Sequence, residues 1–177
     1  MNRLLFRSVY YPCTVLLKVI NVLRPRTYMR LFVWLLRKMG ITFNGIPRYI
    51  SSDVYFDNFS LITISERTVI SKKCVFLTHD YSPTTAFFTP PINENLVKTD
   101  ARMDGKIIIE ENVFIGLRVT ILPNTTIKSN CIIGAGAVVK GVIPPGSVVV
   151  GNPARVMCSI KDYKERCLLR VDKMKWD

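Results

Sequence analysis

An aliphatic residue recurs at every sixth position between Lys106 and Arg155. The series is Ile109, Ile115, Ile121, Ile127, Ile133 and Val139. A second series follows four residues after the first: Val113, Val119, Thr125, Cys131, Ala137 and Ile143. An amphipathic helix needs apolar spacing of three and four and a half-buried strand needs a spacing of two, so neither explains this pattern. A period of six with two inward positions per unit predicts a parallel β-helix, in which stacked coils bury what one coil cannot.

The same period occurs upstream, but it is interrupted before the main block. The upstream series is Ile64, Ile70 and Phe76. The distance from Phe76 to Ile109 is not a multiple of six, and residues 81–105 contain Pro83, Pro90 and Pro91. This composition predicts a long loop that projects from the β-helix, and loops of that length in compact domains are usually functional or disordered. The chain's single histidine, His79, stands at its entrance.

Residues 1–45 are predicted to form a basic helical arm. The chain has a net charge of +12. Nine Lys or Arg residues precede the first acidic residue, Asp53, and the rest of the chain carries nearly equal numbers of basic and acidic residues. Pro12 suits the first turn of a helix that ends at Pro25. A second helical stripe should end at Gly40. Its apolar positions are Tyr28, Leu31, Phe32, Leu35, Leu36 and Met39.

Two interpretations of this arm stay open. Its apolar stripes can pack on the β-helix or on a neighbouring subunit, or residues 1–40 can lie on an anionic membrane with Trp34 at the interface. No uninterrupted apolar run approaches the roughly 18 residues that a membrane-spanning helix requires. Nucleic acid is not expected as a partner, since the chain has no recognised binding module and its aromatic residues stand among aliphatic ones.

The five cysteines show no short-range pairing of the kind that binds metals. Cys74 and Cys131 fall on inward positions of the repeat. They are interpreted as reduced core residues of a cytoplasmic protein, which is also consistent with the absence of a recognisable cleavable signal. With 49% hydrophobic residues, the chain can fill a sizeable core. The flat flanks of a β-helix also lead us to expect self-association.

Several segments closely resemble the hexapeptide-repeat acyltransferases over about residues 46–157. They are N-V-F-I-G at 112–116, I-L-P at 121–123, I-G-A-G-A-V-V at 133–139, I-P-P-G-S at 143–147 and G-N-P-A-R-V at 151–156. The branch with the strongest likeness contains galactoside, maltose, xenobiotic and polysaccharide O-acetyltransferases. The resemblance implies a homotrimer of left-handed parallel β-helices that binds acetyl-CoA between subunits. Residues 158–177 are expected to form a short C-terminal helix.

The resemblance also implies a catalytic base. The segment Thr78-His79-Asp80-Tyr81-Ser82 is similar to the site where the family places a histidine that takes a proton from the acceptor hydroxyl. An imidazole, with a pKa of about 6.5, suits that task near neutral pH. Asp80 is expected to fix the tautomer of His79, or else to face a turn. No metal is expected, because the zinc carbonic anhydrases of this fold bind their metal with three histidines and this chain has only one.

For acetyl-CoA, the resemblance implies a site along the later coils. The residues expected there are Phe114, Leu117, Gly134, Ala135, Lys140 and Arg155. The backbone N–H of Leu117 matches the family position that donates to the thioester oxygen. Lys140 is shifted by one position from the family's usual lysine, which leaves its contact with a phosphate open.

For the acceptor, the residues expected to contact it are Asp57, Asn58, Tyr81 and Arg102. Asp57 and Asn58 can alternatively serve only in a turn. The resemblance thus implies an O-acetyltransferase that moves acetyl from acetyl-CoA to a sugar hydroxyl in the synthesis of surface polysaccharide, in the cytoplasm or at the inner face of the cytoplasmic membrane. The alternatives are N-acetylation of an amino-sugar nucleotide, acetylation of an antibiotic, and a β-helix scaffold without catalytic activity.

Overall fold

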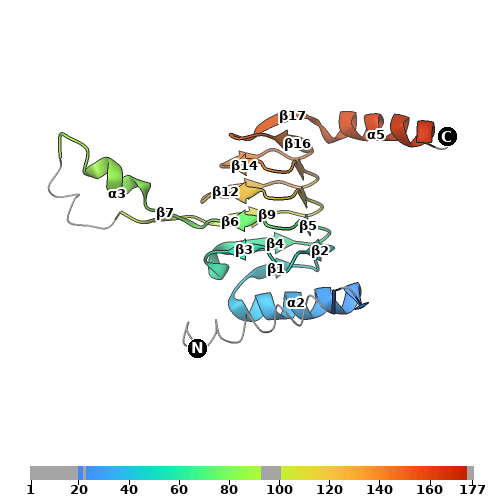
Figure 1. The fold of residues 1–177 in the computed structure, drawn as a ribbon, viewed down its shortest axis with the longest axis horizontal. Helices are drawn as coiled ribbons and strands as arrows, with labels where there is room; N and C mark the ends of the chain where they lie inside the picture. The colour runs from blue at the N-terminus through green and yellow to red at the C-terminus, as the bar shows by residue number, and fades with distance from the viewer. Residues whose placement is uncertain (1–19, 22, 93–100, 175–177) are drawn as a thin grey trace.

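The computed structural model describes residues 20–21, 23–92 and 101–174. Its centre is a parallel β-helix whose coils stack along one axis (Figure 1). The coils are left-handed, as the family resemblance implies. The first helix predicted for the arm lies largely outside the described residues, which include only Ile20, Asn21 and Leu23 from its end.

Three parallel sheets form the faces of the β-helix. Sheet A contains β1 (Thr42–Asn44), β4 (Ile62–Ser65), β9 (Ile107–Ile109), β12 (Thr125–Ile127) and β15 (Val142–Ile143). Sheet B contains β2 (Tyr49–Ile50), β5 (Val69–Ile70), β10 (Phe114–Ile115), β13 (Ile132–Ile133), β16 (Ser147–Val150) and an antiparallel edge strand, β17 (Arg155–Ser159). Sheet C contains β3 (Tyr55–Phe56), β6 (Val75–Phe76), β11 (Thr120–Ile121) and β14 (Val138–Val139).

The sequence period sets the register of these sheets. Ile109 pairs with Ile127, which lies three six-residue units further along the chain, and Ile115 pairs with Ile133 in the same way. Each residue of the two inward series between 109 and 143 is at most 7% exposed. Burial of these aliphatic side chains removes apolar surface from water at each coil, so the predicted core is confirmed.

The corners between the sheets need left-handed backbone at regular intervals. Positive φ angles occur at Asn112, Arg118, Asn124, Asn130 and Gly136, each six residues after the last. Asparagine and glycine tolerate this conformation best, which explains why polar and small residues alternate with the aliphatic ones. One corner is reinforced by stacking, because the Asn112 amide donates to the Asn130 side-chain oxygen at 2.7 Å.

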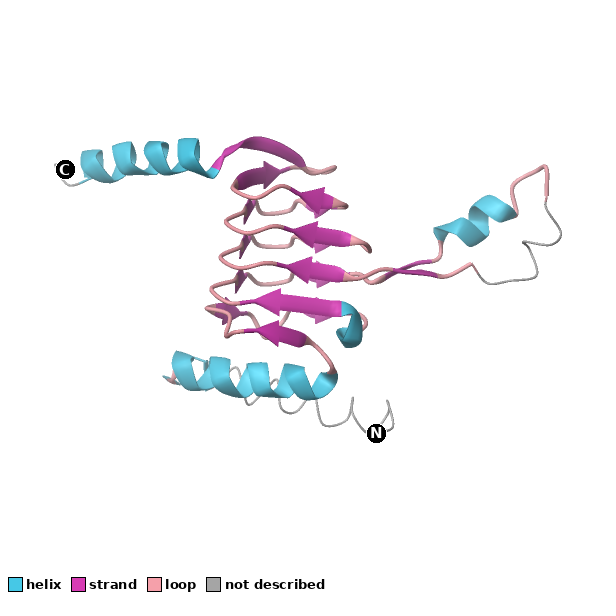
Figure 2. Cartoon of the chain, turned by 180° about the vertical axis from the view of Figure 1, so that it is seen from behind, coloured by secondary structure: helices cyan, strands magenta, loops and turns pink. Residues whose placement is uncertain are grey.

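The predicted loop leaves the β-helix at the corner between sheets C and A, where Figure 2 shows it projecting far to one side. It starts and returns as a two-stranded ribbon of β7 (His79–Asp80) and β8 (Met103–Asp104), and α3 (Ser82–Phe87) follows β7. The ribbon is closed at its base by a hydrogen bond of 2.7 Å from Gly105 N to Thr78 O. The core continues beneath it, since Ile64 pairs directly with Ile109.

Helix α2 (Pro25–Met39) covers the open end of the first coil (Figure 1). The Tyr28 hydroxyl donates to Ile50 O at 2.6 Å, and Ile50 N donates to the Met29 sulfur at 3.3 Å. The buried side chains of α2 are Tyr28, Met29, Phe32, Val33 and Leu36. The helix end is as predicted, with Gly40 in a left-handed conformation at φ 116°.

One detail of the arm prediction was wrong. Leu31, placed in the apolar stripe, is 43% exposed, because the contacts of Tyr28 and Met29 with Ile50 turn Met29 and Val33 toward the core instead. The predicted break at Pro25 is confirmed, since the preceding helical residues end before Arg24, and Pro25 starts α2, where its missing N–H costs nothing. The arm thus packs on the β-helix through one face of α2.

At the other end of the β-helix, α5 (Ile160–Met174) extends away from the last coil (Figure 1). Its first turn is held by the Ser159 hydroxyl, which accepts from Asp162 N at 3.1 Å. Within the described residues, no helix has the length and apolarity needed to cross a membrane.

Two corner glycines allow a stability test of the coil geometry. A Cβ on Gly116 would lie 2.6 Å from Ala135 N in the next coil, whereas a Cβ on Gly136 would meet nothing within 4 Å but would sit at φ +72°. We expect Gly136→Ala to cost about 1–2 kcal/mol from backbone strain. Gly116→Ala should cost about 3 kcal/mol, since a backbone neighbour cannot rotate away.

Asparagine variants at the same two positions serve as the control. Gly136→Asn should be milder than Gly136→Ala because asparagine tolerates the left-handed region, while Gly116→Asn should be more damaging than Gly116→Ala because it is larger. Thermal and urea unfolding of the four variants measure this order. Equal costs of alanine and asparagine at both positions would contradict the corner geometry.

Candidate active site

The corner between sheets C and A brings Asp57 and His79 together from different coils. Asp57 directly follows β3, and Thr78 and His79 follow β6 in the coil above. The two coils are joined at this point by a hydrogen bond of 3.1 Å from Asp57 N to Phe76 O. Sheet pairing therefore places the carboxylate of one coil beside the imidazole of the next.

The Asp57 carboxylate is held by three donors. Its Oδ2 atom accepts hydrogen bonds from His79 Nδ1, from the Thr78 hydroxyl at 2.6 Å and from Thr78 N at 3.1 Å. The Asp57 side chain is 13% exposed. Burial alone would raise the pKa of Asp57, but the hydrogen bonds from Thr78 and His79 hold that pKa below its ordinary value. Asp57 is therefore ionised at neutral pH.

The ionised carboxylate determines the tautomer of His79. A carboxylate can only accept, so Nδ1 must carry the proton that it donates to Asp57. In the neutral imidazole this leaves Nε2 with its lone pair, ready to accept a proton. The His79 side chain is 29% exposed, so a substrate can reach the ring. This arrangement is suited to general-base chemistry, in which Asp57 orients the base and stabilises its charged form.

Thr78 is a functional candidate that the sequence analysis missed. Its side chain is fully buried; its hydroxyl donates to Asp57 and accepts from Asn58 N at 3.1 Å. The only signal in the sequence was a threonine next to the single histidine, and the contact with Asp57 depends on coil stacking. Thr78 thus fixes the carboxylate that orients His79.

The expectation that Asp80 fixes the tautomer of His79 was wrong. The Asp80 carboxylate accepts from Ser82 N at 2.8 Å, where it serves the turn that opens α3, and Asp57 occupies the position at Nδ1. Hydrogen bonds from Ser82, with smaller contributions from the charges of Lys140 and His79, lower the pKa of Asp80. The turn role was the alternative interpretation of this residue.

Asn58 has a local structural role. Its side-chain oxygen accepts from Ser60 N at 3.2 Å and from the Ser60 hydroxyl at 2.8 Å, which caps the short 3-10 helix η1 (Phe59–Leu61). Asp57 turns toward His79 as described. Contacts of Asp57 or Asn58 with an acceptor stay predictions.

Tyr81 and Arg102 lie beside His79 on the projecting ribbon. The Tyr81 ring meets the His79 ring edge-on, with 5.3 Å between centroids, and the Arg102 guanidinium lies 5.8 Å from the Tyr81 centroid. Asp104 fixes Arg102 through an ion pair of 2.7 Å. Tyr81 therefore lies against the imidazole, and Arg102 reaches it only through Tyr81.

The residues predicted to bind acetyl-CoA lie mostly elsewhere on the same chain. Phe114 is on β10, and Leu117, Gly134 and Ala135 follow β10 and β13 at the corner between sheets B and C. Phe114 and Leu117 are 43% and 44% exposed, unlike the aliphatic residues around them. Arg155, at the start of β17, is also exposed.

Lys140 is the exception, because it follows β14 at the corner between sheets C and A. It is exposed and close enough to Asp80 to influence its pKa. One chain therefore carries two groups of candidate residues, on either side of sheet C, and does not bring them together.

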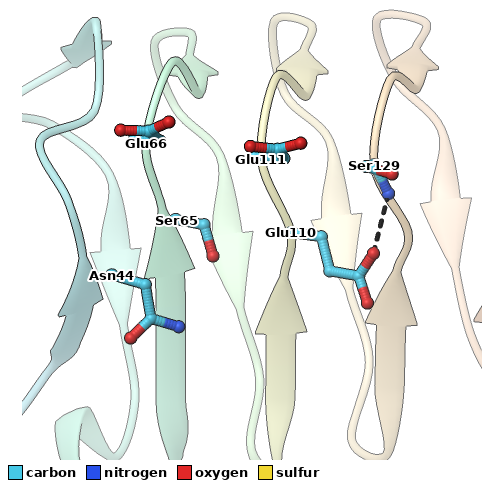
Figure 3. A pocket seen from close by; sticks show the side chains of 6 residues that line it. All are labelled: Asn44, Ser65, Glu66, Glu110, Glu111 and Ser129. Carbon is cyan, nitrogen blue, oxygen red and sulfur yellow. Dashed lines mark hydrogen bonds between the residues drawn. The ribbon is translucent and has the colours of Figure 1, made fainter.

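A groove of about 360 Å³ marks the third corner, between sheets A and B (Figure 3). Its walls are formed by Asn44, Ser65, Glu66, Glu110, Glu111 and Ser129. Glu110 is paired with Lys128 and Glu111 with Arg67, each at 2.8 Å. The glutamates would repel an anionic ligand, and Glu110 and Glu111 already form ion pairs with basic side chains of the protein. We therefore assign no reaction to this groove. Nor do the described residues contain a cluster of three or more His, Cys, Asp or Glu suited to a metal ion.

Comparison with known proteins agrees with this architecture. The family model "Bacterial transferase hexapeptide (six repeats)" matches residues 106–141. WbbJ of Escherichia coli K12, named for O-acetyl transfer in lipopolysaccharide biosynthesis, is 30% identical over 73% of this chain and 65% of its own length. Galactoside O-acetyltransferase of the same organism is 34% identical over 61% of this chain and 52% of its own length. The matched region therefore spans between about half and two thirds of the length of these relatives.

A solved structure of a galactoside acetyltransferase in complex with coenzyme A has the same fold. It superposes with a TM-score of 0.54 at 26% identity, covering 74% of this chain and 70% of that one. The six-residue period, the left-handed stack of coils and these matches all agree, and the chain belongs to the hexapeptide-repeat acyltransferase family.

Proposed function

We propose that this protein transfers an acetyl group from acetyl-CoA to a sugar hydroxyl in surface polysaccharide. The observation that carries the proposal is the Asp57–His79 pair, which presents an imidazole nitrogen as a base at the mouth of a projecting ribbon. The names of the relatives, which include galactoside O-acetyltransferase and a lipopolysaccharide O-acetyl transferase, support the choice of acetyl donor and sugar acceptor.

In the proposed reaction, His79 Nε2 takes the proton of the acceptor hydroxyl while the oxygen attacks the thioester carbonyl carbon. Asp57 stabilises the imidazolium that forms. The tetrahedral oxyanion accepts a hydrogen bond from the backbone N–H of Leu117, a kind of contact worth about 2.7–4 kcal/mol. The intermediate then breaks its C–S bond, and the thiolate of coenzyme A receives the proton from His79. No covalent enzyme intermediate is needed.

The proposed active unit is a homotrimer. Each chain would supply its Asp57–His79 corner to one site and its corner between sheets B and C to the next, so that Phe114, Leu117, Gly134 and Ala135 of one subunit face His79 of another. The exposed apolar side chains on the strands support such association, since Tyr55 and Val142 are 53% and 68% exposed. We place the reaction in the cytoplasm, where acetyl-CoA is available and the buried thiols of Cys74 and Cys131 stay reduced.

The first prediction concerns the base and its orienting carboxylate. His79→Ala should lower acceptor-dependent release of coenzyme A by about 10²- to 10⁴-fold, the usual contribution of a general base. Asp57→Asn should lower kcat by at least about tenfold with little change in KM, because an amide permits the wrong tautomer. Chromatographic detection of coenzyme A across a panel of sugar and amino-sugar acceptors avoids interference from the cysteines.

Asp80→Asn is the matched control for Asp57→Asn. Asp80 is one residue from His79 but bonds to Ser82, so its amide variant should keep most of the kcat. A larger loss for Asp80→Asn than for Asp57→Asn would contradict the assignment. Transfer to amines alone would overturn the hydroxyl acceptor, and no transfer together with no binding of acetyl-CoA would support the scaffold alternative.

The second prediction concerns Thr78. Thr78→Val keeps the shape of the buried side chain but removes the hydroxyl that donates to Asp57. It should lower kcat while leaving KM nearly constant, and Thr78→Ser should restore much of the rate because the hydroxyl returns. Steady-state kinetics of both variants measure this difference. A Thr78→Ser rate as low as that of Thr78→Val would show that packing, and not the hydroxyl, is responsible.

The third prediction tests the shared site by complementation. His79→Ala removes the base from one corner, and Ala135→Trp places a bulky group at the exposed corner between sheets B and C, where acetyl-CoA is proposed to bind. Each variant alone should be nearly inactive. Co-expressed chains should regain a fraction of wild-type kcat, since some sites in a mixed trimer combine two intact corners. No recovery in mixed trimers confirmed by light scattering would mean that each site is built from one chain.

A further inference from the structure

Helix α2 has a second face that the β-helix does not cover. The buried arc of the helix lies on the first coil, and Leu31 and Trp34 project on the opposite side, 43% and 60% exposed. Arg30 and Lys38 flank them and are also exposed. Successive members of this group are one, three and four positions apart, so the four residues form a single stripe along the outside of the helix. We call this stripe the outer face of α2.

The charge of this region has one sign. No acidic residue precedes Asp53, whereas nine basic residues do. Helix α2 itself contains four arginine or lysine residues and no acidic residue. Next to the outer face, Arg30, Val33, Trp34, Arg37 and Ile46 line a shallow hollow of about 120 Å³. Ile46 is 58% exposed at its rim. Apolar side chains and cations are therefore interleaved at the end of the β-helix.

We infer that the outer face of α2 docks on an anionic membrane surface. An interfacial helix buries aromatic and aliphatic side chains at the level of the headgroups, while neighbouring arginine and lysine side chains attract anionic lipids. Trp34 and Leu31 provide the apolar contact, and Arg30 and Lys38 provide the charge. In this orientation α2 lies between the membrane and the first coil of the β-helix.

Charge complementarity selects this occupant over two others. A second copy of the same face would bring cations against cations. The preceding segment, residues 1–19, contains Arg3, Arg7 and Lys18 and no acidic residue, so it has no charge complementary to the outer face. An anionic lipid surface complements the positive charge of the outer face, and the apolar region beneath its headgroups accommodates the apolar side chains. The inference does not depend on acetyl transfer, because it is tested without substrate.

Co-sedimentation of the full chain with vesicles tests the inference. The protein should bind vesicles of phosphatidylcholine and phosphatidylglycerol, bind pure phosphatidylcholine weakly, and dissociate at about 0.5 M NaCl. Arg30→Glu/Lys38→Glu should lower the partition coefficient by at least about tenfold, and Leu31→Ser/Trp34→Ser should lower it as well. All four positions are exposed, so the variants should keep the wild-type melting temperature.

Matched variants on α5 provide the control. Lys161→Glu/Lys164→Glu makes the same change in net charge on another exposed helix, and Leu168→Ser/Leu169→Ser removes two exposed leucines there. Both α5 variants should bind anionic vesicles like the wild type. Equal losses from the α5 and α2 charge variants would reduce the effect to net charge and overturn the inference.

A fluorescence measurement locates the contact. Trp34 and Trp176 are the two tryptophans of the chain, so Trp176→Phe leaves Trp34 as the only one. Its emission should shift to shorter wavelength when anionic vesicles are added. Three results would each overturn the docking of this face on a membrane. They are vesicle binding without that shift, no binding to anionic vesicles, and a loss of self-association in the α2 variants measured by light scattering.

Discussion

The stacking of one coil on the next is the constraint on which this protein depends. Each coil alone has too little core to be stable, so aliphatic side chains at every sixth position bury one another only when the coils are aligned. The same alignment builds the candidate site. The hydrogen bond from Asp57 N to Phe76 O fixes two coils at the C–A corner, and the Asp57 carboxylate is thereby placed against His79. Core packing and chemistry share one register.

The three corners of the β-helix have different surroundings. The corner between sheets A and B carries glutamates that are paired with Arg67 and Lys128. The corner between sheets B and C combines glycine and alanine with exposed Phe114 and Leu117. The corner between sheets C and A contains the imidazole and its carboxylate. The proposed trimer would unite the second and third corners, while the ends of the stack are occupied by α2 and α5.

Much of the fold followed from the sequence because it depends on a repeated local pattern. The six-residue period from Ile109 to Val139 predicted which side chains are buried and that the coils stack, and the broken register after Phe76 predicted the projecting loop. The site was predicted less well. Asp80 stood next to His79 in sequence, but the partner of the imidazole comes from another coil, and only the pairing of β3 with β6 brings Asp57 there. Likewise, Leu31 fitted the helical spacing of α2, but the contacts of Tyr28 and Met29 with Ile50 decided which face was buried.

The central claim is that Asp57 selects the Nδ1–H tautomer of His79, so that the neutral ring carries its lone pair on Nε2. Because the chain has a single histidine, a long-range ¹H–¹⁵N NMR spectrum of protein without a histidine tag reports on this ring alone. Recorded at alkaline pH, it should show the Nδ1–H tautomer, and Asp57→Asn should change the tautomer ratio. A ring protonated on Nε2, or a spectrum unaffected by Asp57→Asn, would contradict the account.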